Sequence, residues 1–183
     1  MINEPARILI IGCDGMIGTA LMSFLVESGV SVIGTTRRKE SITSYKRFLD
    51  LTEKIEQWIV PPTIEVAVLL AGESKVTVCQ KDPERTRQIN VEKIVYLANY
   101  LIANDVFVVY LSTNQVFDGS KPYQTTGSPF SPITEYGKQS TEVETKLQCW
   151  GDSVAILRST KIFGNTVPLF HEWYTKMRAG DPI

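Results

Sequence analysis

A glycine-rich turn near the N-terminus offers the clearest site for chemistry in this sequence. Residues 12–18 read Gly-Cys-Asp-Gly-Met-Ile-Gly, follow an apolar run at residues 7–11, and open a stretch with helical periodicity, residues 16–27. Glycines in such a turn let a pyrophosphate approach the backbone closely, and the following helix presents free N–H groups to the phosphates. This context favours dinucleotide binding over a purely structural turn. The residues expected to contact the dinucleotide are Gly12, Asp14, Gly15, Met16, Ile17 and Gly18.

The residues after the next apolar run indicate which dinucleotide is preferred. Residues 31–35 are followed by Thr36, Arg37 and Arg38, without an acidic residue. NAD sites usually place a carboxylate here for the ribose 2′-hydroxyl. A carboxylate would repel a 2′-phosphate, whereas an arginine can form paired hydrogen bonds with it. We therefore expect NADP(H), with NAD as the alternative cofactor and a solvated basic turn as the alternative without a ligand.

The rest of the chain alternates short β-rich runs with longer helical stretches, which predicts a parallel sheet with helices on both faces. Residues 16–27 show apolar residues at helical spacing, and a weaker helix at 52–59 is stopped by Pro61 and Pro62. We expect one Rossmann-type, doubly wound α/β domain spanning residues 1–183. The predicted strands are 7–11, 31–35, 46–51, 65–70, 107–112 and 153–159. The predicted helices are 16–27, 52–59, 83–103, with Asp82 as N-cap, 134–149 and 168–179.

Composition and charge argue against several classes of protein. The net charge is −1, from 19 basic and 20 acidic residues, and no basic stripe is present, so nucleic-acid binding is not expected. Apolar runs are too short to span a bilayer, and the N-terminus lacks the pattern of a signal peptide. Three dispersed cysteines and one histidine give no metal-ligand spacing. We expect a cytoplasmic protein without a metal site.

Four segments together resemble the extended short-chain dehydrogenase/reductases. They are residues 12–18, the run Leu-Ser-Thr-Asn-Gln-Val-Phe-Asp-Gly at 111–119, Tyr-Gly-Lys at 136–138, and Leu-Arg-Ser-Thr-Lys-Ile-Phe-Gly at 157–164. Within that family the sequence is most similar to the dTDP-4-dehydrorhamnose reductase branch. The resemblance implies an NADP(H)-dependent reductase of a 4-keto-6-deoxy sugar nucleotide.

The resemblance also implies a role for individual residues. Thr113 matches the residue that hydrogen-bonds the substrate carbonyl, Tyr136 the tyrosine that exchanges a proton with it, and Asn90 the asparagine of the proton relay. Each has a structural alternative, because Asn90 can satisfy buried backbone and Tyr136 can simply pack. The remaining cofactor contacts implied are Asp50 and Leu51 at the adenine, and Ala71, Gly72 and Tyr136 beside the nicotinamide half.

One departure from the family concerns the catalytic lysine, which lies four residues after the tyrosine and here is Ser140. Tyrosine has a pKa of about 10, so about one in a thousand is ionised near neutral pH. A neighbouring ammonium stabilises the tyrosinate, which serine cannot do as a charge. Lys138 projects about 200° away from Tyr136 on a helix, whereas Lys161 remains a candidate replacement. Asn114 also replaces the family's aspartate.

A second departure is length, because family members continue into a small C-terminal substrate domain, whereas this sequence stops at Ile183. We expect that lobe to be absent or truncated. Three functions stay open: a sugar-nucleotide reductase, a non-catalytic nucleotide-binding or regulatory protein, and a sugar-nucleotide epimerase or dehydratase. The second class has a precedent in the resemblance, since the family includes the regulatory β-subunit of methionine adenosyltransferase. The partners to consider are a nucleotide sugar, a second copy of the chain, and a regulated protein.

Overall fold

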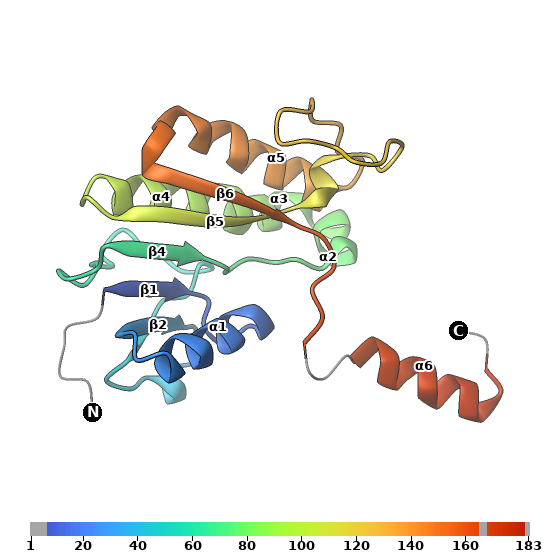
Figure 1. The fold of residues 1–183 in the computed structure, drawn as a ribbon, viewed down its shortest axis with the longest axis horizontal. Coiled ribbons are helices and arrows are strands. Elements are labelled where there is room, and N and C mark those ends of the chain that lie inside the picture. Colours follow the sequence, from blue (N-terminus) through green and yellow to red (C-terminus); the bar gives the residue numbers. More distant parts are fainter. Residues whose placement is uncertain (1–6, 165–167, 182–183) are drawn as a thin grey trace.

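The computed structural model describes residues 7–164 and 168–181, which are built around a six-stranded parallel sheet (Figure 1). The strand order is β3-β2-β1-β4-β5-β6, the order of a doubly wound dinucleotide-binding fold, which confirms the predicted fold class. The strands are β1 (Ile8–Ile11), β2 (Val32–Thr36), β3 (Lys46–Phe48), β4 (Val66–Leu69), β5 (Phe107–Thr113) and β6 (Val154–Ser159).

Helices connect β1 to β2, β4 to β5 and β5 to β6, and one further helix follows β6. They are α1 (Met16–Glu27), α2 (Val76–Lys81), α3 (Pro83–Arg87), α4 (Ile94–Ile102), α5 (Glu135–Leu147) and α6 (Pro168–Ala179). A π-helical turn, η2 (Gln88–Lys93), joins α3 to α4, and short 3-10 turns lie at η1 (Lys39–Ser41), η3 (Asn114–Val116) and η4 (Gln148–Ser153). The predicted N-cap is confirmed, because the Asp82 carboxylate accepts a hydrogen bond from the Arg85 backbone N–H.

The core is divided between the two faces of the sheet, as the period-two alternation of a strand dictates. Leu9 and Ile11 of β1 belong to the larger cluster, where they are covered by residues such as Leu97 of α4 and Leu147 of α5. Ile10 points the other way, into a smaller cluster beside α1. The carboxyl end of β1 is therefore held from both sides at the point where the glycine-rich turn begins.

Cover on the α1 side is incomplete over the far strands. Ile156 of β6 packs against the larger cluster, so its neighbour Leu157 faces the α1 side, where its surface is 54% exposed. Helix α6 stands away from the sheet in Figure 1 and leaves Leu157 open to solvent. Within the described residues, no helix is long and apolar enough to cross a membrane.

The structure corrects three of the predicted elements. Residues 52–59 form turns rather than a helix, because Ile55 and Val60 are both buried in the larger cluster and Trp58 packs edge-on against Tyr100. The strand predicted at 46–51 pairs only over β3. Helix α2 was not predicted, and the long helix predicted at 83–103 is interrupted by the π-helical turn η2.

Candidate functional site

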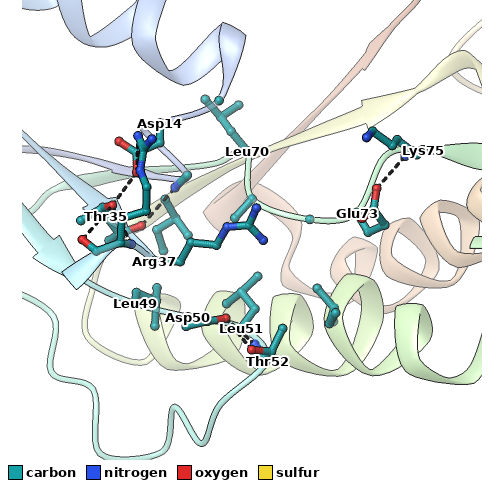
Figure 2. A pocket seen from close by; sticks show the side chains of 18 of the residues that line it. Asp14, Thr35, Arg37, Leu49, Asp50, Leu51, Thr52, Leu70, Glu73 and Lys75 are labelled. Atoms are coloured by element: carbon teal, nitrogen blue, oxygen red, sulfur yellow. Dashed lines mark hydrogen bonds and ion pairs between the residues drawn. The ribbon is translucent and has the colours of Figure 1, made fainter. Parts of the chain in front are cut away.

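A groove of about 470 Å³ opens at the carboxyl ends of β1, β2 and β4 (Figure 2). Ligands of open α/β sheets bind at this edge, where the strand order reverses between β1 and β4. Most of the residues predicted to contact a dinucleotide line the groove. They are Gly12, Asp14, Gly15, Thr36, Arg37, Arg38, Asp50, Leu51, Ala71 and Gly72.

Four predicted contact residues do not line the groove: Tyr136, which lies in a second cavity described below, and three residues at the start of α1. Met16 begins α1 with half of its surface exposed, Ile17 is half-buried, and Gly18 is buried beneath the turn. A Cβ atom on Gly18 would lie 2.3 Å from the Gly12 carbonyl oxygen, so Gly18 serves the close packing of helix on turn. Gly18 therefore has a packing role. Met16 and Ile17 lie in the first turn of α1, so only their backbone N–H groups are placed near the start of the helix.

The glycine-rich turn presses directly against β4. Gly12 has φ +96°, and a Cβ atom there would lie 2.8 Å from the Ala71 backbone nitrogen, so a side chain would force the strand end away. Gly15 differs, because its Cβ would meet only the Gly12 carbonyl oxygen, at 3.5 Å. The space over Gly15 is therefore free within the protein, and a phosphate group could reach the backbone there.

Asp14 gathers a cluster of charges at one wall of the groove. Its Oδ2 accepts from the Thr36 hydroxyl at 2.5 Å and lies 3.2 Å from Arg38 Nη2, while Oδ1 lies 3.0 Å from Lys46 Nζ. Partial burial opposes ionisation, but the hydrogen bonds from Thr36, Lys46 and Arg38 outweigh it and lower the pKa of Asp14 to about 2. Asp14 is therefore a carboxylate at any neutral pH.

Arg37 differs from Arg38 in its surroundings. Its side chain extends into the groove (Figure 2), and no carboxylate of residues 7–164 or 168–181 forms an ion pair with it. Arg38 instead is already paired with Asp14. The sequence treated the two arginines as equivalent; the structure shows that Arg38 shares its charge with Asp14, whereas Arg37 does not.

A second, smaller cavity of about 70 Å³ adjoins the groove and contains Tyr136, Ser140, Tyr110 and Asn90. Burial and the Cys79 sulfur raise the pKa of the Tyr136 phenol, and a hydrogen bond with Ser140 only partly opposes the rise. The Ser140 hydroxyl also donates to the Tyr136 carbonyl oxygen at 2.9 Å. Serine at position 140 therefore contacts Tyr136 without supplying a positive charge.

Neither Lys138 nor Lys161 is among the groups that shift the pKa of Tyr136. Lys138 pairs with Glu135 at 2.6 Å on the outside of α5, with more than half of its side chain exposed. Lys161 is exposed, and the groups that shift the pKa of Tyr136 include neither it nor any other described cation. The surroundings of Tyr136 therefore hold its phenol in the neutral form.

Asn90 has all of its amide hydrogen-bonding groups engaged within the protein. Its Oδ1 accepts from the Glu73 backbone N–H at 2.7 Å, and its Nδ2 donates to the Glu73 carbonyl oxygen at 2.9 Å and to Gln139 Oε1 at 2.8 Å. The Gln139 amide in turn donates to the Thr86 hydroxyl. This network joins the wall of the groove to α5, so in this structure Asn90 acts as a positioning residue.

Thr113 lies at the carboxyl end of β5 and lines neither cavity. Its Oγ1 accepts a hydrogen bond from the Gln115 backbone N–H at 3.2 Å and caps η3, which begins at Asn114. This hydrogen bond uses a lone pair of Oγ1 and leaves the hydroxyl proton of Thr113 unengaged by it.

A clamp that the sequence did not reveal holds the loop between η3 and α5. Glu144 of α5 is fully buried, accepts from the Ser112 hydroxyl, and forms an ion pair with Arg158 at 2.7 Å. The Arg158 guanidinium lies 5.1 Å from the ring centres of both Phe117 and Phe130. One available signal is spacing, because Tyr136, Ser140 and Glu144 follow each other at four-residue intervals on one helix face.

Within the described residues, no group of three or more histidine, cysteine, aspartate or glutamate side chains is arranged to hold a metal ion.

Comparison with known proteins gives the family of the chain. A family profile described as the RmlD substrate binding domain matches residues 6–179. Methionine adenosyltransferase 2 subunit beta of Rattus norvegicus is 29% identical over 178 residues, which is 96% of this chain and 53% of that protein. The dTDP-4-dehydrorhamnose reductase of Aggregatibacter actinomycetemcomitans is 29% identical over 163 residues, which is 87% of this chain and 52% of that protein.

Solved structures show the same fold. A hypothetical dTDP-4-dehydrorhamnose reductase from Sulfolobus tokodaii superimposes with a TM-score of 0.80 at 27% identity, over 97% of this chain and 63% of the other. The Bacillus anthracis dTDP-4-dehydrorhamnose reductase, solved in complex with NADP, gives 0.77 at 20% identity, over 100% and 63% of the two chains. The chain thus spans about half the length of the curated relatives named above.

Proposed function

The chain belongs to the family described as the RmlD substrate binding domain, and on this premise we propose that it binds NADP(H) in the groove without an efficient reductase centre. The observation that carries the proposal is that Tyr136 lies beside Ser140 in a cavity where no described cation acts on its phenol. The resemblance implies a lysine at position 140, so the groove would be kept without the group that activates the tyrosine.

The charges at the end of β2 support the choice of NADP(H). Two cations, Arg38 and Lys46, share one carboxylate, and Arg37 adds a further unpaired charge inside the groove. The net charge of these four side chains is +2, which suits a phosphate dianion on the adenosine ribose. The space over Gly15 and the N-terminus of α1 suit the pyrophosphate.

The reaction expected of the family requires a hydride, which bound NADPH supplies, and a proton for the developing alkoxide, which Tyr136 would donate. A raised pKa makes Tyr136 a poorer acid than an ordinary tyrosine. If an ammonium at position 140 normally lowered that pKa by about three units, its loss would cost about 4 kcal/mol, or roughly a thousandfold in rate. We therefore propose a binding or regulatory role, with another protein as the partner, in line with the name of the relative called methionine adenosyltransferase 2 subunit beta.

A second candidate function is reduction of a 4-keto-6-deoxy sugar nucleotide. It is favoured by the presence of both Thr113 and Tyr136 and by the relatives named dTDP-4-dehydrorhamnose reductase. The two functions differ in one measurable quantity, the rate of ketone reduction once NADPH is bound.

Cofactor binding is tested by calorimetric titration with NADPH and NADH. We expect NADPH to bind more tightly, and Arg37→Met to weaken it about tenfold or more, since a charged hydrogen bond contributes roughly 1.5–3 kcal/mol. Lys39→Met is the matched control, because Lys39 lies over the Phe48 ring and does not line the groove. Equal or tighter binding of NADH by the unmodified protein would contradict the preference.

Catalysis is tested by following NADPH oxidation with dTDP-4-keto-6-deoxyhexose. We expect little turnover by the unmodified chain and a gain in Ser140→Lys, whose ammonium would enter the cavity beside Tyr136. Thr145→Lys adds the same charge at an exposed position of α5 and serves as the control. Rapid turnover by the unmodified chain would refute the binding-only function and support the reductase.

A further inference from the structure

Asp14 is the acidic side chain of the glycine-rich turn, and its position beside the end of β2 has a consequence for cofactor choice. We propose that Asp14 sets how strongly the groove prefers a nucleotide with a 2′-phosphate, by engaging the cations that would otherwise bind that phosphate. The inference rests on the proposed function, since it concerns the same groove and assigns a specificity-determining residue within it.

The geometry places one carboxylate among three donors. The Thr36 hydroxyl, the Arg38 guanidinium and the Lys46 ammonium all contact Asp14, at 2.5, 3.2 and 3.0 Å. These donors come from the end of β2, the residues just after it, and the start of β3. In doubly wound folds the adenosine ribose lies at the end of the second strand. A 2′-group would therefore arrive within reach of the cluster that Asp14 already neutralises in part.

The same contacts put Asp14 in competition with a 2′-phosphate. A phosphate that hydrogen-bonds Arg38 must share that guanidinium with the carboxylate, and the two anions then lie within a screening length of each other. Asp14 is also well shielded, with 18% of its side chain exposed, so water screens the repulsion only partly. NADH carries no charge at the 2′ position and does not incur this repulsion.

The substitution Asp14→Asn removes the charge of the side chain while keeping nearly the same shape, so it tests the effect of the charge alone. It keeps an oxygen that can accept from Thr36 and removes the negative charge from Arg38 and Lys46. One charge pair at contact distance contributes about fivefold in water, and the effects of the two charges of a phosphate dianion multiply to at most about 25-fold. Screening by salt reduces this, so we expect about a tenfold change in preference.

The experiment measures dissociation constants of NADPH and NADH, and of 2′,5′-ADP and ADP as shorter probes, by calorimetric titration. Asp14→Asn should raise the preference for the 2′-phosphorylated member of each pair about tenfold. Glu40→Gln is the matched control, since Glu40 is an exposed acid in η1, near the same basic residues, that does not line the groove. Its effect should stay within about twofold, the size of a solvent-screened surface charge.

Asp14→Ala, which also removes the acceptor for Thr36, should change the preference in the same direction, and a thermal melt establishes that each variant is folded. An unchanged preference in folded Asp14→Asn would overturn the inference. A fall in preference would also overturn it, and would assign Asp14 to the ribose 2′-hydroxyl or to holding the cations in place. If the unmodified protein bound none of the four nucleotides, the proposed function would fail first, and this inference with it.

Discussion

Replacement of Arg158 by methionine tests the clamp that joins β6, α5 and the loop after η3. In the native structure the Glu144 carboxylate is fully buried, and its charge is balanced by Arg158. Methionine keeps most of the length and apolar surface of the arginine side chain but removes the charge, so Glu144 would retain only the Ser112 hydroxyl as a described donor. The variant therefore isolates the cost of an unbalanced buried carboxylate.

The expected loss of stability follows from burial. Removing one partner of a buried ion pair typically costs about 3–5 kcal/mol, because the other charge stays desolvated. Two lost cation–π contacts, to Phe117 and Phe130, add up to about 1 kcal/mol each at partly exposed sites. A loss of about 4 kcal/mol is a large part of the 5–15 kcal/mol typical of a domain.

Urea denaturation followed by circular dichroism gives the free energy of unfolding of each variant. At a slope of about 2 kcal/mol per molar urea, the midpoint of Arg158→Met should fall by about 2 M. The double variant Glu144→Gln, Arg158→Met should recover at least half of the loss, because no unbalanced charge remains. Trypsin should also cleave faster after Lys121, which lies in the loop that the clamp holds. A loss below about 1 kcal/mol, the value of an exposed pair, would refute the reasoning.

Three further predictions concern the groove and the adjoining cavity. Gly15→Val should abolish nucleotide binding in a folded protein, whereas Gly18→Ala should unfold the turn; retained binding by folded Gly15→Val would place the phosphates elsewhere. The pKa of Asp14 in the folded state, about 2, lies below its ordinary value of 3.8, so its ionisation stabilises the fold above pH 3.8 by about 2 kcal/mol, and this contribution is lost as the pH falls towards 2. Urea unfolding of the unmodified protein and of Asp14→Asn should therefore differ at pH 7 and converge near pH 2; a constant difference would argue against the pKa shift. The pKa of Tyr136 should stay above 10 and fall in Ser140→Lys, as followed by ultraviolet titration against Tyr136→Phe; no fall would show that a lysine at this position does not reach the phenol.

The fold could be predicted from the sequence wherever periodicity and end signals agreed. The helix expected at 16–27 matches α1, because the glycine-rich turn before it and the apolar spacing within it point to the same boundary. Asp82 followed by proline likewise predicted where α3 begins. Apart from the strand predicted at 46–51, which ends at Phe48, strand ends were found to within one residue, since buried parallel strands are short and continuously apolar.

The elements that were missed depend on contacts distant in the sequence. A helix was expected at residues 52–59, but Ile55 is buried in the larger cluster while Ile59 is exposed. The Val60 backbone N–H donates to the Tyr100 hydroxyl forty residues away. Helix α2 is short, and its Val-Thr-Val start has the composition of a strand. The π-helical turn has no sequence signal that we recognise.

The site was predictable in its location and less so in its charges. The glycine-rich turn and the basic residues after β2 predicted where a dinucleotide would lie, and the groove opens there. The difference in ion pairing between Arg37 and Arg38 was not predictable, because it depends on contact with Asp14 in the glycine-rich turn. Lys46, the other cation of the cluster, is 32 residues from Asp14 in the sequence, and only folding brings the two side chains into contact.

Because the Glu73 backbone N–H donates to Asn90 Oδ1, the hydrogen-exchange rate of this amide reports how often the wall of the groove opens. Glu73 lies on the wall of an open, solvent-filled groove, yet its N–H donates inward to a side chain that is 7% exposed. Exchange of that hydrogen for deuterium requires Glu73 to separate from Asn90. The exchange rate therefore measures how often this hydrogen bond opens, and not simply whether the amide lies near water. A loop amide that exchanges as slowly as a strand amide would report, without any bound ligand, how much of the groove is already in place before a nucleotide arrives.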